Sequence, residues 1–333
     1  MKKFLLAVTT GTAITLSIVW TRHILSAEAP LIPSAHEPST ITIGWVGDMV
    51  PSDDATYNTS VFANVQGLLE QPDLMIGNLE GTFADSDRTS KCLAPVPSCF
   101  AFRGDPAFAT ALKDAGFDLV SLVNNHSFDY GKDGLTDTEA VLDAADIPYI
   151  SPTKTTASIV VKGKRIGILG LSFTDGDIKT YAYIQKQAAE LKATNDFVIV
   201  IFHGGAEGAD KTAVTGAEEF QGSEDRGNVE LAAHTAINAG ADVVLGSGPH
   251  VLRKIEQYKN GLIAYSLGNF EGGDGELDTS GILGDSGIIM VTLTPDAAPT
   301  HTFTSIHLSP NGIPFPDPTD TGKNLVENLS KIK

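Results

Sequence analysis

Short apolar runs alternate with amphipathic segments along most of this chain, and this alternation limits the possible folds more than any other feature. The apolar runs that predict buried strands cover residues 41–46, 74–76, 118–122, 197–202 and 242–245. Helical patterns lie between them, over residues 61–70, 106–115, 135–145, 181–192 and 229–239. Such alternation is typical of βαβ units and therefore of an α/β fold.

The remaining pattern predicts additional strands and no further helices. Lys162-Gly163-Lys164 separates two apolar runs and indicates a hairpin. After residue 245 the helical patterns stop, and strands are expected over residues 251–258, 262–266, 287–293 and 302–308. Two βα-rich halves followed by a β-rich segment predict two packed sheets flanked by helices.

The first residues have the pattern of an export signal. Lys2 and Lys3 precede a mostly apolar stretch over 4–20, and Ala27-Glu28-Ala29 offers small residues for cleavage. We therefore expect residues 1–29 to be a signal peptide or an uncleaved signal anchor. Both alternatives export the rest of the chain, to the periplasm, the extracellular space or the outer face of the cytoplasmic membrane. The pattern then predicts a tether over 30–39, a domain over 40–310 and a C-terminal tail over 311–333.

The charge of the chain argues against nucleic acid as a partner. Lys and Arg number 23 against 41 Asp and Glu, which gives a net charge of −18. Binding a nucleic acid requires clustered basic side chains to neutralise its phosphates. We expect no nucleic-acid partner.

Two cysteines, Cys92 and Cys99, lie in a proline-rich segment. In an exported protein such a pair most simply forms a local disulfide. The spacing matches no thiolate metal site.

Polar side chains that can bind metals follow the predicted strands. Loops at the carboxyl ends of strands in α/β sheets converge, so we expect these side chains to lie together. Carboxylate, amide and imidazole ligands suit one or two ions of Mn, Zn or Fe. Taken singly, each residue could be a turn, cap or core residue, but six strand ends with the same placement favour a site. The residues are Asp48, Asn78, Glu80, Asn124, Asn125, His126, His203, His250 and Asn269.

Six segments, in order and spacing, resemble the CapA family of poly-γ-glutamate capsule synthesis proteins. The resemblance covers about residues 40–295 and implies a metallophosphoesterase-type (calcineurin-like) two-sheet sandwich flanked by helices, α/β/β/α. The segments are Val46-Gly47-Asp48, Gly77-Asn78-Leu79-Glu80, the run from Leu122 to Gly131, Phe202-His203-Gly204-Gly205, Pro249-His250-Val251-Leu252, and Tyr265-Ser266-Leu267-Gly268-Asn269-Phe270.

The resemblance also implies roles for these residues. Asp48, Glu80 and His250 are expected around one metal position. Glu80, Asn125 and His203 are expected around a second position. His126, with Asn125 beside it, would act on the substrate as a general acid or transition-state stabiliser. Asn78, Asn124 and Asn269 would line the site.

Two positions depart from the family pattern. Gly248 stands where the family usually has the first histidine of His-Pro-His, and Val50 stands where phosphoesterases have the histidine of Asp-x-His. Because a lower ligand count weakens metal binding, a mononuclear, weakly loaded or metal-free site is a further hypothesis.

Three functions are compatible with these patterns. The first is synthesis, export or anchoring of poly-γ-glutamate or a similar envelope polymer, together with membrane capsule-synthesis proteins. The second is metal-dependent hydrolysis of phosphoesters or envelope amide bonds, and the third is polymer binding without catalysis. Whether the protein is an enzyme is left open. The cations expected to form a groove for a polyanion are Arg103, Arg226, Arg253 and Lys254.

Overall fold

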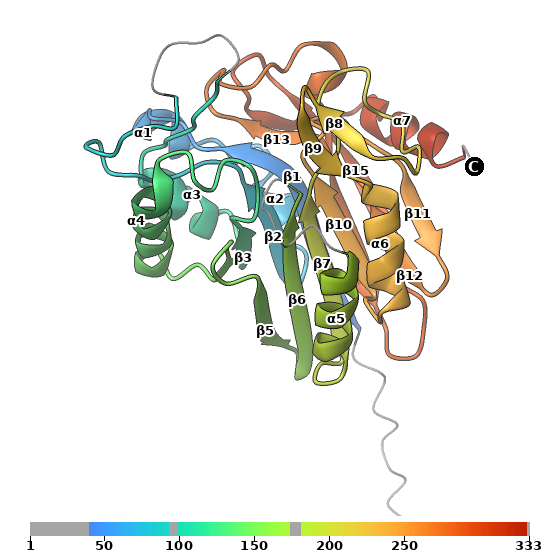
Figure 1. Cartoon of the computed structure of the whole chain (residues 1–333). Helices are drawn as coiled ribbons and strands as arrows, with labels where there is room; N and C mark the ends of the chain where they lie inside the picture. The colour runs from blue at the N-terminus through green and yellow to red at the C-terminus, as the bar shows by residue number, and fades with distance from the viewer. Residues whose placement is uncertain (1–39, 93–98, 174–180, 332–333) are drawn as a thin grey trace, which may run out of the picture. The chain divides into compact units, whose positions relative to one another are not determined.

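The computed structural model describes residues 40–92, 99–173 and 181–331 (Figure 1). Pro38–Lys333 forms one compact unit. The predicted export segment and tether, residues 1–39, lie outside the described residues. In the described ranges, no helix combines the length and apolar character needed to cross a membrane.

The first sheet has eight strands and is built around β1. Its order is β16-β15-β14-β1-β2-β3-β4, and β13 pairs with β1 in addition. Strands β1 to β4 run parallel to one another, whereas β14 is antiparallel to β1. The strands are β1 (Ile41–Val50), β2 (Leu74–Leu79), β3 (Leu119–Ser121), β4 (Tyr149–Ile150), β13 (Asn269–Gly272), β14 (Asp285–Leu293), β15 (Thr300–Leu308) and β16 (Pro314–Pro316).

The second sheet has six strands in the order β11-β12-β10-β7-β6-β5. Its four central strands are parallel, and β5 and β11 close the two edges as antiparallel strands. The predicted hairpin is present, and Lys162 and Gly163 form its turn with positive φ angles of 47° and 78°. The strands are β5 (Thr156–Val161), β6 (Lys164–Ser172), β7 (Phe197–His203), β10 (Val243–Ser247), β11 (Ile255–Tyr258) and β12 (Gly261–Ala264). A separate hairpin joins β8 (Glu219–Gln221) to β9 (Glu224–Gly227).

The two sheets pack face to face, with helices on their outer faces (Figure 1). In β1, Ile43 and Trp45 enter the core between the sheets, and Val46 enters the core under the helices of the first sheet. Neighbouring side chains of a strand point to opposite faces, so a strand buried on both faces reads as a continuous apolar run. The predicted α/β/β/α sandwich is confirmed. Its helices are α1 (Ala55–Asn58), α2 (Gln66–Leu69), α3 (Ala107–Asp114) and α4 (Gly131–Ala144) on the first sheet, and α5 (Tyr181–Lys192) and α6 (Val229–Asn238) on the second.

The expectation that no helix follows residue 245 is wrong. A 3-10 helix, η2, covers Gly281–Gly284, and α7 covers Thr321–Leu329. Val326 of α7 is buried in the core between the sheets, and α7 packs against β15. The predicted tail 311–333 therefore contains β16 and α7. The helix was missed because its segment is polar overall, although Leu325, Val326 and Leu329 have the spacing of one helical face.

Candidate metal centre

Three buried side chains from both sheets meet at the ends of their strands. Asp48 lies in β1, Glu80 directly follows β2, and His203 is the last residue of β7. One ligand atom from each lies within 4.8 Å of the others. Their exposed fractions are 0%, 0% and 1%. The convergence predicted from the strand ends is therefore present for these three residues.

Asp48 is held by hydrogen bonds on both carboxylate oxygens. Asn78 Nδ2 donates to Oδ1 at 2.8 Å, and the backbone N–H of Gly248 donates to Oδ2 at 3.1 Å. Burial alone would raise the pKa of Asp48, but the hydrogen bond with His250 and the charges of His203 and His250 outweigh it and lower the pKa to about 2. Asp48 is thus a fixed, ionised carboxylate.

Local backbone geometry explains the glycine before Asp48. The Asp48 N–H donates to the carbonyl of Gly268 at 3.1 Å, which brings the two segments close together. A Cβ at Gly47 would collide with that same carbonyl oxygen. Only glycine allows β1 to approach the segment before β13 this closely.

Glu80 and His203 carry buried polar atoms that no described residue satisfies. Both Glu80 carboxylate oxygens and His203 Nε2 have no hydrogen-bond partner in the described part of the chain. Glu80 Oε1 lies 3.4 Å from His203 Nε2. A buried carboxylate without a donor is costly unless a cation compensates it. The residues present therefore fit a divalent ion.

The pKa shifts of these two residues follow from their burial. Burial, together with the charge of Asp48, raises the pKa of Glu80 well above its usual value. Burial lowers the pKa of His203 to about 3, although the charge of Asp48 opposes the shift. The imidazole is therefore neutral, which is the form that binds metals. Ser247 Oγ lies 3.0 Å from His203 Nδ1 and fixes the ring.

His250 lies on the other side of Asp48. Its Nδ1 is 2.8 Å from Asn269 Oδ1 and 3.4 Å from Asp48 Oδ2, and its Nε2 is 3.9 Å from Glu80 Oε1. Because an amide oxygen only accepts hydrogen bonds, Nδ1 carries a proton and Nε2 faces Glu80. Burial would lower the pKa of His250, but the carboxylates of Glu80 and Asp48 raise it to about 10. Ligation of a metal would require the neutral form of this imidazole.

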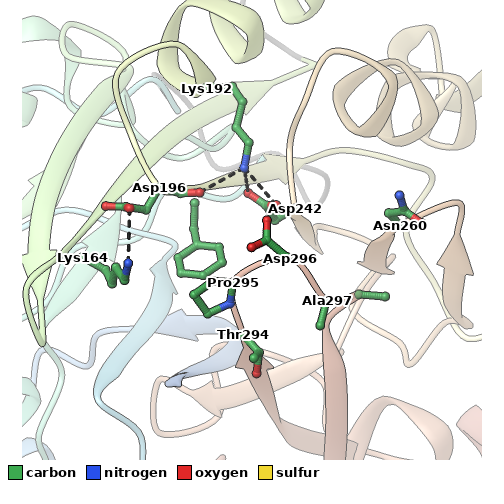
Figure 2. Close-up of a pocket in the computed structure, with 11 residues that line it drawn as sticks. Lys164, Lys192, Asp196, Asp242, Asn260, Thr294, Pro295, Asp296 and Ala297 are labelled. Carbon is green, nitrogen blue, oxygen red and sulfur yellow. Dashed lines mark hydrogen bonds and ion pairs between the residues drawn. The ribbon is translucent and has the colours of Figure 1, made fainter. Parts of the chain in front are cut away.

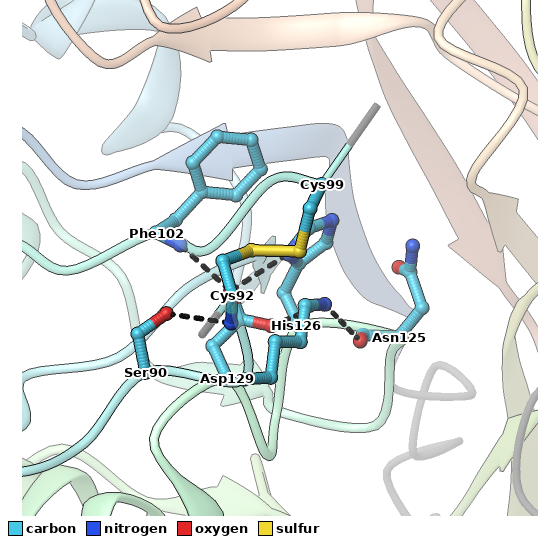
Figure 3. Close-up of a disulfide and its surroundings, with 8 residues drawn as sticks. Ser90, Cys92, Cys99, Phe102, Asn125, His126 and Asp129 are labelled. Carbon is cyan, nitrogen blue, oxygen red and sulfur yellow. Dashed lines mark hydrogen bonds and ion pairs between the residues drawn. A yellow bond between two sulfur atoms is a disulfide. The ribbon is translucent and has the colours of Figure 1, made fainter. Parts of the chain in front are cut away.

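His126 lies at the edge of the same site, in the loop between β3 and α4. Its Nε2 is 3.9 Å from Glu80 Oε1, and its Nδ1 is 2.8 Å from Asp129 Oδ2. Burial lowers the pKa of His126, and Asp129 partly opposes that shift. The ring also lies against Phe102, with centroids 4.4 Å apart. Figure 3 shows His126 and Asp129 beside the disulfide between Cys92 and Cys99.

The two asparagines before His126 have different positions. Asn124 Nδ2 donates to Asn78 Oδ1 at 3.1 Å and to the carbonyl of Leu79 at 2.8 Å, so Asn124 ties the loop to β2. Asn125 Oδ1 is buried, and no described residue forms a hydrogen bond with it. Its roles as a metal ligand and as a catalytic residue stay predictions.

Sequence reasoning missed several contacts of the site. Asp129 lies within the segment from Leu122 to Gly131, and Ser247 is the last residue of β10, but neither was assigned a role. Glu207 was not among the predicted site residues, and its Oε1 lies 2.6 Å from Nη2 of the buried Arg226. The three-residue spacing of His126 and Asp129 was a sequence signal for the contact between these two side chains. No sequence signal connects Glu207 to Arg226, because the contact depends on how the loop folds back.

Gly248 is required by the backbone at its position. Its φ is +112°, and a Cβ there would lie 2.9 Å from Gly204 N and 3.2 Å from His203 Nε2. A histidine at this position would be strained and would crowd His203. A histidine could take this position without strain only in a different backbone conformation.

Two other features lie away from this centre. Glu230, His234 and Glu256 form a second, partly exposed cluster, in which Lys254 Nζ lies 2.9 Å from Glu230 Oε1. A pocket of about 450 Å³ lies where β6, β7 and β10 begin, the opposite strand ends from His203 (Figure 2). Its lysines pair with its own aspartates, Lys192 with Asp242 at 2.8 Å and Lys164 with Asp196 at 3.6 Å.

The sandwich and the strand-end cluster define a protein of the metallophosphoesterase fold class. A solved structure described as a novel phosphatase from Mycoplasma pneumoniae superposes with a TM-score of 0.51 and 13% identity, covering 86% of this chain and 99% of that chain. At this identity, the likeness shows the fold alone.

The model of the family described as bacterial capsule synthesis protein PGA_cap matches residues 42–273, and the chain belongs to this family. It is 30% identical over 285 residues to the capsule biosynthesis protein CapA of Bacillus anthracis, covering 77% of this chain and 65% of that protein. It is 27% identical over 259 residues to the PGA biosynthesis protein CapA of Bacillus subtilis, covering 73% and 66%. These matches span just under two thirds of the relatives' length. The resemblance to the CapA family is confirmed.

Proposed function

We propose that this protein acts in the synthesis, export or anchoring of poly-γ-glutamate or a similar anionic envelope polymer, and that it does so through a divalent-metal site. Family membership and the names of the two Bacillus relatives support a role in making an envelope polymer such as poly-γ-glutamate. The export pattern of residues 1–29 supports a location outside the cytoplasmic membrane or on its outer face. Membrane proteins of capsule synthesis are the partners that this location suggests.

The buried, unsatisfied atoms of Glu80 and His203 are the observation that carries the metal site. Asp48, Glu80, His203 and His250 would hold the ion, with Asn125 as an additional oxygen ligand. Oxygen and imidazole ligands suit Mn, Zn or Fe. A divalent ion supplies Lewis acidity, which activates water and polarises a phosphoryl or carbonyl group.

The residues around this position can bind and orient a substrate. His126 is fixed by Asp129 through Nδ1, and its Nε2 faces Glu80. In the protonated form of the imidazole, Nε2–H can donate its proton to the leaving atom of a scissile ester or amide. The hydrogen bonds from Asn78 and the Gly248 N–H hold Asp48 in place. The reaction that this arrangement supports best is hydrolysis or transfer at a phosphoester or an amide of the polymer.

The test is turnover by the full chain supplied with Mn²⁺, using a γ-glutamyl oligomer and a generic phosphodiester. We expect His126→Gln to lower the rate by about 10²-fold or more while metal content is unchanged. Glu80→Gln should lower both. Turnover that survives exhaustive chelation, or that is equal in Glu80→Gln, would contradict the proposal.

A second candidate is a polymer-binding protein without catalysis. Gly248 favours it, because its backbone conformation excludes a histidine ligand at that position. This candidate predicts that the wild-type chain binds the γ-glutamyl oligomer with the same affinity with and without chelator, and that no substrate is turned over.

A further inference from the structure

The four cations expected to form a groove have different environments. Arg253 is fully buried, and its guanidinium donates to Glu219 twice, at 2.9 and 2.7 Å, and to the carbonyls of Lys211 and Ala206. Lys254 is paired with Glu230. Both are held by protein acceptors and are structural.

Arg103 is likewise not arranged as a buried anion-binding donor. Its guanidinium lies over the ring of Tyr130, 5.4 Å from the centroid, and 3.9 Å from Asp53 Oδ1. The side chain is partly exposed. Water can therefore satisfy its remaining donors.

Arg226 alone among the four combines burial with an unused donor. Its exposed fraction is 3%, and Nη1 has no hydrogen-bond partner among the residues that the structure describes. Nη2 lies 2.6 Å from Glu207 Oε1, and Nε donates to Glu224 Oε2 at 3.2 Å. These two contacts fix the plane of the guanidinium, and no described residue accepts a hydrogen bond from Nη1. A buried donor without a partner is destabilising, and more so when it is charged.

The backbone places Arg226 beside the candidate metal centre. Arg226 lies in β9, and its carbonyl accepts a hydrogen bond at 2.8 Å from the N–H of Gly205, two residues after His203. The β8–β9 hairpin thus lies at the same end of the second sheet as the site residues (Figure 1). The electrostatics agree with this placement. Burial is the main cause of the pKa shifts of Glu80 and His203. The charge of Arg226 opposes the rise in the pKa of Glu80 and adds to the fall in the pKa of His203.

We infer that Arg226 Nη1 is an anion-binding donor of this site and holds a carboxylate or phosphate oxygen of the substrate next to the metal ligands. A guanidinium edge matches the planar geometry of such oxyanions. The inference rests on the proposed function, because poly-γ-glutamate carries a free α-carboxylate on every residue. In a chain with a net charge of −18, a fixed cationic donor offsets the general repulsion of a polyanion at the point of contact.

The test is equilibrium binding by calorimetry, using the full chain and two probes, a γ-glutamyl oligomer and inorganic phosphate. We expect Arg226→Gln to weaken binding of at least one probe tenfold or more, and Arg226→Lys to weaken it less. Arg165→Gln is the matched control, because Arg165 is exposed at the opposite end of β6 and the charge change is the same. It should change affinity less than twofold. An oligomer whose carboxylates are blocked as amides should bind wild type and Arg226→Gln equally.

A measurement on the wild-type chain covers the case in which Arg226→Gln does not fold. Side-chain NMR of ¹⁵N-arginine-labelled protein should show the Arg226 guanidinium signal, assigned with Arg226→Lys, shifting on addition of the binding probe. An unshifted signal with bound probe overturns the inference.

The remaining outcomes separate this inference from the proposed function. Arg226-dependent binding of phosphate but not of the oligomer supports the anion donor and contradicts a γ-glutamyl substrate. Equal oligomer binding by wild type and Arg226→Gln overturns the inference and leaves the proposed function intact. Binding of neither probe by wild type overturns the inference, and metal content measured on the same sample then decides the metal site separately.

Discussion

Glu80 and Asp129 are both completely buried carboxylates near His126, yet their environments differ. Asp129 accepts from the Phe102 N–H at 2.7 Å and has Lys91 Nζ at 2.5 Å, so its charge is compensated within the protein. Glu80 has no hydrogen-bond donor among the described residues. The contrast indicates that Asp129 positions His126, whereas Glu80 is arranged for a cation.

At the scale of residues, a site residue could be predicted from the sequence where a polar side chain directly follows an apolar run. Asp48, Glu80 and His203 could be predicted in this way, because the carboxyl ends of strands converge. Ser247 could not be assigned a role, and Arg226, expected only as a groove cation, could not be placed at the metal centre, because their contacts with the site are formed only by tertiary structure. Their local sequences carry no periodic signal.

Glu271 gives a prediction for the pH dependence of stability. Burial raises its pKa to about 8, despite the hydrogen bonds from Tyr57 and the Gly273 N–H. The folded state therefore holds a proton that the unfolded chain releases above its ordinary pKa of 4.5. The stabilising contribution of Glu271 is fully present below pH 4.5, and it is lost as the pH rises through about 8. The free energy of unfolding should fall across this range.

Glu271→Gln should remove this dependence. We expect the variant to exceed wild type by about 1–3 kcal/mol in free energy of unfolding near pH 8.5, and by much less near pH 5. Urea denaturation at both pH values measures the difference. Glu276→Gln, an exposed change on the following loop, is the control. Parallel pH profiles for wild type and Glu271→Gln would show that Glu271 is ionised in the folded protein.

At the scale of elements, apolar runs were predicted, whereas elements with mostly polar residues were not. The strands β1, β6, β7 and β10 follow from their composition, as does the turn of the β5–β6 hairpin. The helix α7 and the β8–β9 hairpin could not be predicted, because their stability comes from packing against other elements. The expected helix over 61–70 is shortened to α2, and the residues before it form turns.

The disulfide closes a short loop beside His126, and this gives an element-scale prediction. Cys92 and Cys99 are seven residues apart, and Phe102, which contacts the His126 ring, lies three residues after the second cysteine. Closing a loop of this length is worth about 2–3 kcal/mol through the entropy of the unfolded chain. The double variant Cys92→Ser/Cys99→Ser should lose about this much free energy of unfolding.

Reductant provides the control for this prediction. Dithiothreitol should destabilise the wild-type chain to the level of the double variant and leave the double variant unchanged. If wild type is equally stable in oxidising and reducing buffer, the disulfide makes no contribution to folding.

At the scale of the whole molecule, the site exists only because two sheets pack together. Asp48 and Glu80 come from the first sheet, and His203 and His250 from the segments of the second. The alternation of strands and helices predicted two sheets, and the family resemblance implied how they pack. The return of β14 to pair with β1 could not be predicted, because strand order is set by long-range contacts.

The most direct test of the account is the binding of Mn²⁺ and Zn²⁺ to the metal-stripped full chain, by calorimetry and thermal unfolding. We predict at least one ion bound per chain, with an increase in stability of about 2.7 kcal/mol at a free metal concentration of 100 Kd. Glu80→Ala should abolish both effects. His234→Ala, in the partly exposed second cluster, should abolish neither. A folded wild-type chain that binds neither ion, or binding that Glu80→Ala retains and His234→Ala removes, would contradict the account.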